Sequence, residues 1–272
     1  MSERKPPRIL AIAGSDSSGG AGIQADIKTI AMLGGYAMTA ITAVTAQNTL
    51  GVQAIAPMGG GIVAKQIASC IEDIGVDAIK IGMLHDVEII DAVASELERL
   101  EGKVSVVLDP VMIATSGDAL IAPDAVSMLR DRLFPLASLI TPNLPELEHL
   151  AERSLRTNDE MADAALELAD AHDCDVLAKG GHTDDARIID MLVSPGDDRA
   201  VSFNHARIDT RHTHGTGCTL SSAIATLLGH GQPMEHAVRL ARKFVYHAIE
   251  QAPGFGGGNG PLGHQAVRTT AR

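Results

Sequence analysis

The residues best suited to catalysis or binding form a glycine turn at 214–219, with the sequence HGTGCT, directly ahead of an apolar stretch. Its two glycines let backbone N–H groups converge on one point, and the N-terminus of a helix favours negative charge there. We therefore expect the amides of Gly215, Thr216 and Gly217 to form an anion site. Phosphoryl transfer depends mainly on positioning and on charge stabilisation, so a nest of this kind suits it.

Cys218 lies inside this turn and is the candidate base. A free thiol has a pKa of about 8.5, and a helix N-terminus lowers it, so we expect some thiolate near neutral pH. Two alternatives stay open. The side chain could be a small buried hydrophobe, or it could be the nucleophile of a hydrolase with His212 or His214 as its partner. The surrounding glycines favour a phosphate over an acyl group.

A second glycine loop, at 14–22, resembles two nucleotide-binding motifs and matches neither. In a Walker A motif, a lysine and then a serine or threonine follow the second glycine, but this chain has Gly20 and Ala21 there. A relaxed dinucleotide fingerprint fits 20–25, yet the segment 39–49 holds no carboxylate for a ribose hydroxyl. Both classes of nucleotide site are therefore disfavoured.

The function that we still expect of this loop is to let a flat ligand approach its backbone closely. Asp16 and Asp26 are placed to accept hydrogen bonds from such a ligand. The alternative is an ordinary strand-to-helix turn in which Asp16 or Ser17 caps the helix.

A third glycine loop, GFGGGNG at 254–260, follows the last expected helix. Its composition is compatible with a solvated turn and equally with a flap over a bound ligand. The sequence does not choose between the two.

The elements that must position these loops alternate along the chain. Short apolar runs indicate strands that we expect to be parallel, at 8–14, 37–46, 77–81, 104–108, 138–140, 176–178 and 188–193. Between them, apolar residues indicate helices over 20–33, 62–74, 220–228 and 237–248. This alternation predicts an α/β fold with helices on both faces of a mainly parallel sheet, and ligands at the carboxyl ends of its strands.

Size and composition bound the class of protein. The 272 residues, 45% of them hydrophobic, suffice for a single domain spanning 1–272, with short polar tails at 1–7 and 265–272. The formal charge of −12, with few aromatic side chains and no tryptophan, argues against a nucleic-acid partner. An anionic small-molecule substrate would need a local positive site.

The cysteines and the hydropathy pattern indicate a compartment. Cys70, Cys174 and Cys218 are far apart and lack paired spacing, so we expect no disulfide framework. No apolar run approaches the ~18 residues of a membrane span, and no leader pattern opens the chain. These features predict a cytoplasmic protein without a membrane partner.

Seven segments, taken in order, resemble the hydroxymethylpyrimidine and phosphomethylpyrimidine kinases of thiamine biosynthesis, within the ribokinase-like superfamily. They are AGSDSSGGAGIQAD at 13–26, TAQNT at 45–49, KIGML at 80–84, LDPVM at 108–112, TPNLPE at 141–146, KGGH at 179–182 and HGTGCT at 214–219. The resemblance spans nearly the whole chain. It implies a three-layer α/β/α sandwich with a mostly parallel sheet, a homodimer, and the use of ATP and Mg²⁺.

The resemblance also implies roles for individual residues. Cys218 stands where the sugar kinases of the superfamily carry an aspartate base. Lys179 and Asn143 are similar to residues that bind the nucleotide phosphates, and Glu146 and Asp109 to residues that organise Mg²⁺. Simpler interpretations stay open, because Asn143 and Glu146 have the spacing of a reciprocal helix cap and Asp109 precedes Pro110 at a strand end.

Gln47 is the residue that would identify the substrate. Its carboxamide offers an acceptor beside two donors, which can pair with a ring nitrogen and an exocyclic amine of an aminopyrimidine. In the family, Gly14, Met83 and Val111 would supply apolar walls for the ring, with Asp26 as a further substrate contact.

Two rival functions stay open. A pyridoxal kinase of the same subfamily would bind a hydroxymethylpyridine, which lacks the amine that matches Gln47. A ligand-binding domain that kept the fold without catalysis is disfavoured, because Cys218, Lys179 and the glycine turn are all present.

Overall fold

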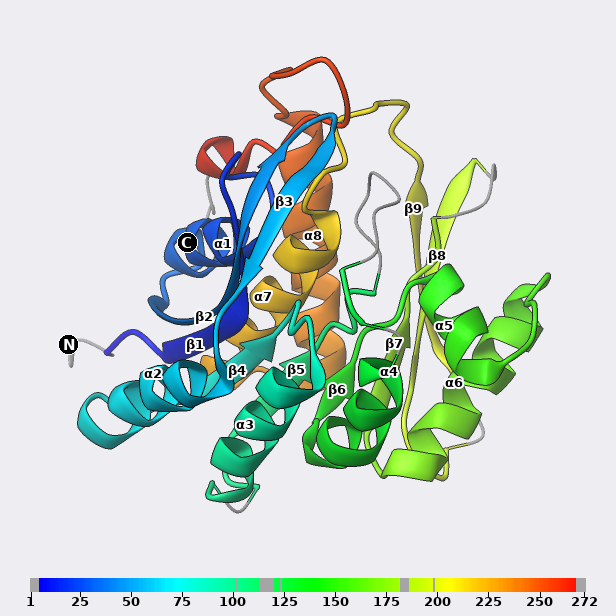
Figure 1. The fold of residues 1–272 in the computed structure, drawn as a ribbon. Coiled ribbons are helices and arrows are strands. Elements are labelled where there is room, and N and C mark those ends of the chain that lie inside the picture. The colour runs from blue at the N-terminus through cyan, green and yellow to red at the C-terminus, as the bar shows by residue number, and fades with distance from the viewer. Residues whose placement is uncertain are drawn as a thin grey trace.

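One nine-stranded sheet runs through the centre of the structure, a computed structural model that describes residues 5–100, 102–112, 120–122, 124–181, 186–197 and 199–267. The strand order is β3-β2-β1-β4-β5-β6-β7-β8-β9. Helices cover both faces, so the expected three-layer α/β/α architecture is confirmed (Figure 1). Of the expected polar tails, 1–4 and 268–272 lie outside the described residues, and Val267 is buried against α8.

The bounds of the elements follow the apolar runs closely. The strands are β1 Arg8–Asp16, β2 Tyr36–Asn48, β3 Gly51–Pro57, β4 Ala78–Ile81, β5 Ser105–Leu108, β6 Leu139–Ile140, β7 Asp175–Ala178, β8 Arg187–Val193 and β9 Val201–Ala206. The helices are α1 Gly22–Met32, α2 Gly60–Asp73, α3 Val87–Glu98, α4 Ala125–Met128, α5 Leu144–Ala151, α6 Asn158–His172, α7 Thr216–Gly229 and α8 Met234–Glu250. A π-helical turn at Leu129–Leu133 and 3-10 turns at Phe134–Leu136 and His264–Ala266 complete them.

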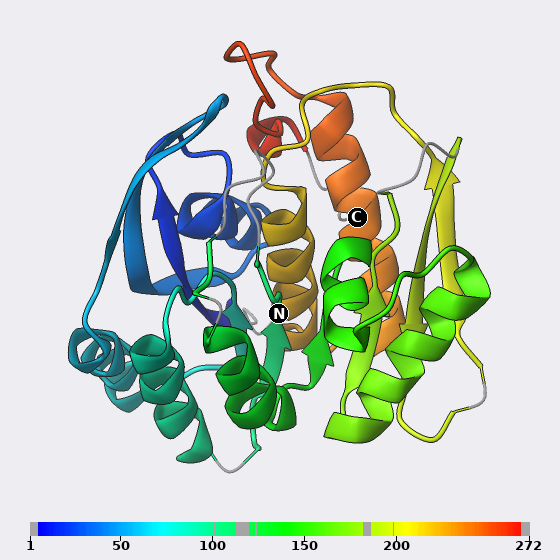
Figure 2. The ribbon, with the colours of Figure 1, turned by 45° about the vertical axis from the view of Figure 1, so that its right-hand side comes forward.

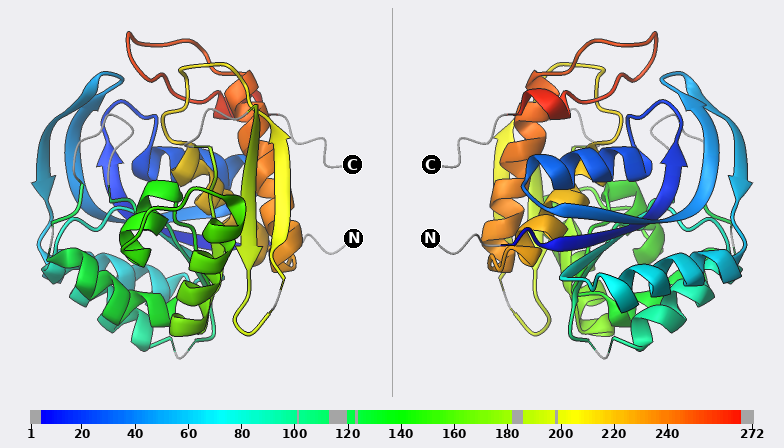
Figure 3. Two further views of the ribbon diagram at one scale, coloured as in Figure 1. Left: turned by 90° about the vertical axis from the view of Figure 1, so that its right-hand side faces the viewer. Right: turned by 90° about the vertical axis from the view of Figure 1, so that its left-hand side faces the viewer.

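Alternate residues of each central strand pack into different cores. In β1, Leu10 and Ile12 join the core under α2 to α6, whereas Ile9 and Ala11 join the core under α1, α7 and α8. This is the two-residue period of a strand, and because both faces are covered the strand is apolar throughout. Figures 2 and 3 show the two layers of helices from other sides.

The edges of the sheet correct the expectation of parallel strands. The six strands from β2 to β7 in the spatial order are parallel, but β8 pairs antiparallel with β7 and with β9. β3 pairs antiparallel with β2 at the other edge, and neither β3 nor β9 was expected. Both unexpected strands are largely exposed, so they lack the continuous apolar run that marks the inner strands.

Candidate active site

The carboxyl ends of the parallel strands bring the expected site residues side by side. Backbone hydrogen bonds between neighbouring strands continue past the strand ends. The Asp109 N–H donates to the Ile81 carbonyl, and the Thr141 N–H to the Leu108 carbonyl, both at 2.9 Å. Lys179 then donates to the Pro142 carbonyl at 2.8 Å. Residues that are up to 70 positions apart in sequence therefore form one row, as the parallel topology predicts.

Lys179 and Asp109 form the charged end of the site. The ammonium of Lys179 lies 2.6 Å from Asp109 Oδ1, which also accepts a hydrogen bond from Thr141 Oγ1 at 3.0 Å. Burial disfavours the charge on Lys179, but the attraction of Asp109 and Glu146 outweighs it, so its pKa is raised. Lys179 is thus a cation paired with Asp109 and further stabilised by the charge of Glu146.

Glu146 lies beside this pair and caps a helix. Its carboxylate accepts from the Asn143 backbone N–H at 2.8 Å, while Asn143 Oδ1 accepts from the Glu146 N–H at 2.9 Å. This reciprocal capping box starts α5 and confirms the structural alternative for the two residues. Burial raises the pKa of the Glu146 carboxyl, because the attraction of Lys179 offsets it only partly and Asp109 adds repulsion.

The glycine turn meets the charged end at Gly217. A Cβ atom added there would lie 3.2 Å from Asp109 Oδ2 and 3.5 Å from Lys179 Nζ. The N-cap of α7 is Gly215, in the left-handed region at φ 88°, and it offers no side chain to the first amides of the helix. Of the three residues whose amides were expected to bind an anion, Gly217 lies against a lysine and a carboxylate, whereas the Thr216 N–H already donates to the Thr213 carbonyl at 3.2 Å.

Cys218 corrects the expectation of a lowered thiol pKa. Burial raises the pKa of the Cys218 thiol to about 11, and the negative charges of Asp26 and Asp109 act in the same direction. The ammonium of Lys80 and the backbone N–H of Gly22 oppose this without reversing it. The helix N-terminus is outweighed by desolvation, so the thiol keeps its proton at neutral pH.

Asp26 is also corrected, because it has no surface to offer a substrate. Its side chain is 0% exposed, and its two oxygens accept from the ammonium of Lys80 at 2.9 and 3.0 Å. Ser222 Oγ donates to the same carboxylate at 2.6 Å. The sequence did carry a signal for this pair, since Lys80 is a charged residue inside the buried strand β4.

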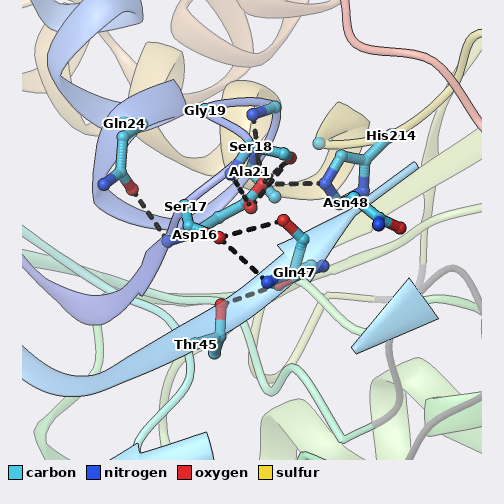
Figure 4. A network of polar contacts seen from close by, with 12 residues as sticks. Asp16, Ser17, Ser18, Gly19, Ala21, Gln24, Thr45, Gln47, Asn48 and His214 are labelled. Carbon is cyan, nitrogen blue, oxygen red and sulfur yellow. Dashed lines mark hydrogen bonds and ion pairs between the residues drawn. The ribbon is translucent and has the colours of Figure 1, made fainter. Parts of the chain in front are cut away.

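Asp16 organises the first glycine loop and does not face a ligand. Its carboxylate, 3% exposed, accepts hydrogen bonds from the backbone of Ser18, Gly20 and Ala21. His214 Nε2 donates to it at 2.9 Å, as Figure 4 shows. Burial favours the neutral acid, but these donors together lower the pKa of Asp16 to about 2. Sequence reasoning missed this link, which ties the loop at 14–22 to the turn at 214–219.

His214 brings the three glycine loops together. Its ring contacts Asp16, and its backbone N–H donates to the Gly260 carbonyl at 3.1 Å. The loop at 254–260 is therefore docked: Asn259 N also donates to Thr49 O at 2.9 Å, at the tip of the β2–β3 hairpin. The bond of His214 to Asp16 gives no support to a hydrolase in which His214 activates Cys218.

The apolar residues expected around the substrate ring do share one place. Met83 and Val111 belong to a small hydrophobic cluster with Ala43, separate from the main cores. A Cβ atom at Gly14 would lie 3.0 Å from Met83 Sδ, so glycine gives this methionine room without a shift. Three of the five expected substrate residues are thus brought together.

Gln47 lies near the end of β2, on the face that Ala43 and Thr45 also share by the two-residue period. Its backbone N–H donates to Ser17 Oγ at 2.9 Å, and its backbone carbonyl accepts from the same hydroxyl at 2.9 Å (Figure 4). The side-chain oxygen lies 3.1 Å from Thr45 Oγ1, whose one proton is shared with the Ser15 carbonyl at 3.0 Å. The amide nitrogen keeps its two donors and the oxygen keeps a lone pair, so the carboxamide can both donate to a ligand and accept from it.

Comparison with known proteins agrees with this geometry. The profile of the phosphomethylpyrimidine kinase family matches residues 16–263. The chain is 46% identical over 258 residues to the hydroxymethylpyrimidine/phosphomethylpyrimidine kinase of Rhizobium meliloti, covering 94% of this chain and 96% of that protein.

Two further comparisons extend the range. A thiamine biosynthesis bifunctional protein of Geobacter sulfurreducens is 45% identical over 94% of this chain, which spans about half (52%) of that protein's length. The ADP complex of Bacillus subtilis pyridoxal kinase superposes with a TM-score of 0.87 at 36% identity, covering 97% of this chain and 99% of the other. Among the described helices, none has the length and apolar character needed to cross a membrane.

Proposed function

Because this chain belongs to the phosphomethylpyrimidine kinase family, we propose that it phosphorylates 4-amino-5-hydroxymethyl-2-methylpyrimidine and then the resulting monophosphate, with ATP, in thiamine diphosphate biosynthesis. One structural observation carries the proposal: Gly217 of the glycine turn packs against the Asp109–Lys179 pair. Backbone donors and a lysine thus converge where a transferring phosphoryl group needs charge stabilisation.

The phosphate end of the site has the residues that a nucleotide requires. We assign Lys179, Asn143 and the amides of Gly215 to Gly217 to the phosphates of ATP. The described residues contain no cluster of three metal-ligating side chains. This fits Mg²⁺, which proteins usually hold by one or two carboxylates together with substrate phosphates. Asp109 and Glu146 would supply those carboxylates, and the ion would neutralise phosphate charge.

The two transfers differ in what the protein must remove. In the first, the hydroxymethyl oxygen forms a bond to the γ-phosphorus as the bond to ADP breaks, and the hydroxyl proton passes to the thiolate of Cys218. In the second, the attacking oxygen belongs to a phosphate monoester that is already anionic, so no base is needed. With the pKa of Cys218 near 11, the thiolate is a minor species at neutral pH, and the first step should speed up as pH rises.

The ring of the substrate is assigned to the other end of the site. Gly14, Met83 and Val111 would flank it, and the amide group of Gln47 would face the ring nitrogens and the exocyclic amine. A coupled assay of ATP consumption with the aminopyrimidine, its monophosphate and no substrate tests the proposal. ATP consumption that neither pyrimidine stimulates would contradict it.

A second candidate activity, phosphorylation of pyridoxal, has the support of the Bacillus subtilis likeness. Pyridoxal carries a comparable hydroxymethyl group on a pyridine ring, which lacks the amine expected to pair with Gln47. Adding pyridoxal as a further arm of the same assay separates the two. We expect a lower kcat/KM for pyridoxal than for the aminopyrimidine.

We further propose a cytoplasmic homodimer. The three cysteines are all free thiols, which fits a reducing compartment. Val44 and Leu50, on the hairpin at one edge of the sheet, are 47% and 72% exposed, and a second copy would cover them. Light scattering on the eluting protein gives the mass directly, and a monomer at micromolar concentration would contradict the dimer.

A further inference from the structure

Lys80 is among the largest fully buried side chains of the described residues, and it comes from the central strand β4. It pairs with Asp26, also 0% exposed, and has no route to water. Well-packed apolar residues usually give equal or greater stability than a buried ion pair, so a pair of this kind is weak evidence for a stabilising role. Its position suggests a different purpose.

The pair locks two helices together next to the proposed base. Ser222 on α7 donates to Asp26 on α1 at 2.6 Å, and the ammonium of Lys80 reaches the same carboxylate from β4 at 2.9 Å. Ser222 lies one helical turn beyond Cys218, and Asp26 lies one turn beyond Gly22, the first residue of α1. Residues four apart lie on the same helix face, so this contact joins α1 and α7 one turn from Cys218.

The surroundings of Lys80 leave little room for another arrangement. A Cβ atom at Gly82 would lie 2.7 Å from Lys80 Nζ, so glycine at this position clears space for the ammonium. The same face of β4 packs against α7, since Ala78 joins the core that contains Leu220 and Ala223. The ammonium is therefore confined between the strand and the first turns of both helices.

Four charged groups influence the pKa of the Cys218 thiol. Lys80 from β4 and Lys179 after β7 favour a negative charge on its sulfur, and Asp26 from α1 and Asp109 after β5 oppose it. Lys179 and Asp109 belong to the phosphate end and are engaged with each other. Lys80 and Asp26 are then the two charges acting on the thiol that do not belong to the phosphate end.

We infer that Lys80 is a positioning residue for the first phosphoryl transfer: with Asp26 and Ser222 it fixes α7 against α1 one turn from Cys218 and keeps a buried positive charge beside that thiol. This inference rests on the proposed role of Cys218 in the kinase. It adds that the fully buried pair acts on the thiol and does not merely fill the core.

The test compares two substitutions that remove charges of opposite sign. Lys80→Met removes a positive charge, and Asp26→Asn removes a negative one. The pH dependence of iodoacetamide alkylation at Cys218, followed by peptide mass spectrometry on the full chain without substrate, reports the thiolate fraction. A neighbouring charge shifts a pKa by one unit or more, so Lys80→Met should lower that fraction about tenfold at a given pH and Asp26→Asn should raise it about tenfold. The double variant should return close to the starting value.

A matched control is a buried ion pair away from the site, Arg242 with Asp190, whose side chains are 9% and 8% exposed. Arg242→Met should destabilise the chain in urea, as the Lys80 and Asp26 variants do, yet leave alkylation of Cys218 within about twofold. If Lys80→Met does not fold, Asp26→Asn and the double variant carry the same comparison. The inference would be overturned if the thiolate fraction of Cys218 changed in the same direction in both single variants, or by less than twofold in each.

A kinetic measurement adds a second readout. Lys80→Met should reduce kcat for the alcohol about tenfold, with KM and the monophosphate step nearly unchanged. A rise in KM for both substrates would indicate general damage to the site and would contradict the positioning role. Because alkylation needs no turnover, it still tests Lys80 if the proposed substrate is wrong.

Discussion

The two ends of the site are built in contrasting ways. At the phosphate end, Lys179, Asp109 and Glu146 engage one another and nearby backbone groups. At the ring end, Met83 and Val111 form an uncharged cluster, and the carboxamide of Gln47 has a donor and an acceptor left for a ligand. If the proposed assignment holds, the phosphate end must exchange partners when a ligand arrives, whereas the ring end already has its apolar walls in place.

The physical reason is the cost of burying charge. A buried carboxylate or ammonium without a partner is expensive, so these groups pair with each other in the absence of a nucleotide. Apolar side chains and glycines carry no charge, so they need no partner in the absence of a ligand. Substitutions at the phosphate end should therefore reduce the rate strongly for every substrate, and those at the ring end should alter the choice between substrates.

The largest effect is expected for Cys218→Ala. Removing a base costs about 10²–10⁴ in rate, and the loss should fall on the alcohol and largely spare the monophosphate. Single-turnover rates with each substrate measure this. In the unmodified protein the alcohol step should rise with pH toward about 11, since burial raises the pKa of the Cys218 thiol to that value and only the thiolate accepts a proton. Equal losses for both substrates would assign Cys218 to the shape of the site.

Lys179→Met should rank next and should act on both steps. Loss of one preorganised donor to a developing charge typically lowers kcat by about 10²–10³, and here it also leaves Asp109 and Glu146 without their cation. Steady-state kinetics with the alcohol and with the monophosphate should show similar losses. Arg153→Met, which breaks an exposed ion pair with Glu167, is the control and should be neutral. Damage to one substrate alone would break the proposed division of the site.

Gly217→Ala probes the contact between the glycine turn and the charged pair. The added methyl group would lie 3.2 Å from Asp109 Oδ2 and force a shift of a few tenths of an ångström. A displacement of that size should reduce kcat/KM about tenfold, since misplacement by 1 Å can cost 10²-fold. Gly61→Ala, in α2 with open space around it, is the matched control. Unchanged kinetics for Gly217→Ala would remove this turn from the phosphate site.

Gln47→Met should change selectivity more than rate. The variant keeps the approximate size but loses both the donors and the acceptor that would pair with the amine, so the ratio of kcat/KM for the aminopyrimidine to that for pyridoxal should fall about fivefold, the value of one net hydrogen bond. Gln53→Met, on the exposed side of β3, serves as the control. An unmoved ratio would remove Gln47 as the determinant of the substrate.

The smallest functional effect is expected for the link between the two ends, Asp16. The folded protein lowers the pKa of this carboxyl from 3.8 to about 2, so its stabilising contribution is present above pH 4 and is lost as pH falls toward 2. A shift of this size corresponds to about 2 kcal/mol in the free energy of unfolding. Urea titrations between pH 3 and 7 should show the deficit of Asp16→Asn shrinking as pH falls, and a constant deficit would contradict this account.

The sequence by itself determined the features that are local along the chain. The apolar runs predicted seven of the nine strands, because a strand buried on both faces has a continuous apolar sequence. The spacing of Asn143 and Glu146 anticipated a cap that the structure confirms, and the turn at 214–219 does open a helix. The family resemblance, also a property of the sequence alone, is confirmed.

Tertiary structure alone decided which distant groups meet and what their meeting does to them. Asp26 and Lys80 are 54 residues apart and Asp16 and His214 are 198 apart, and no local pattern pairs them. The thiol of Cys218 was expected to be acidic because a helix N-terminus favours negative charge. In the fold, the loss of water and the nearby carboxylates dominate. Burial depends on everything packed around a residue, and that is information the neighbouring sequence does not contain.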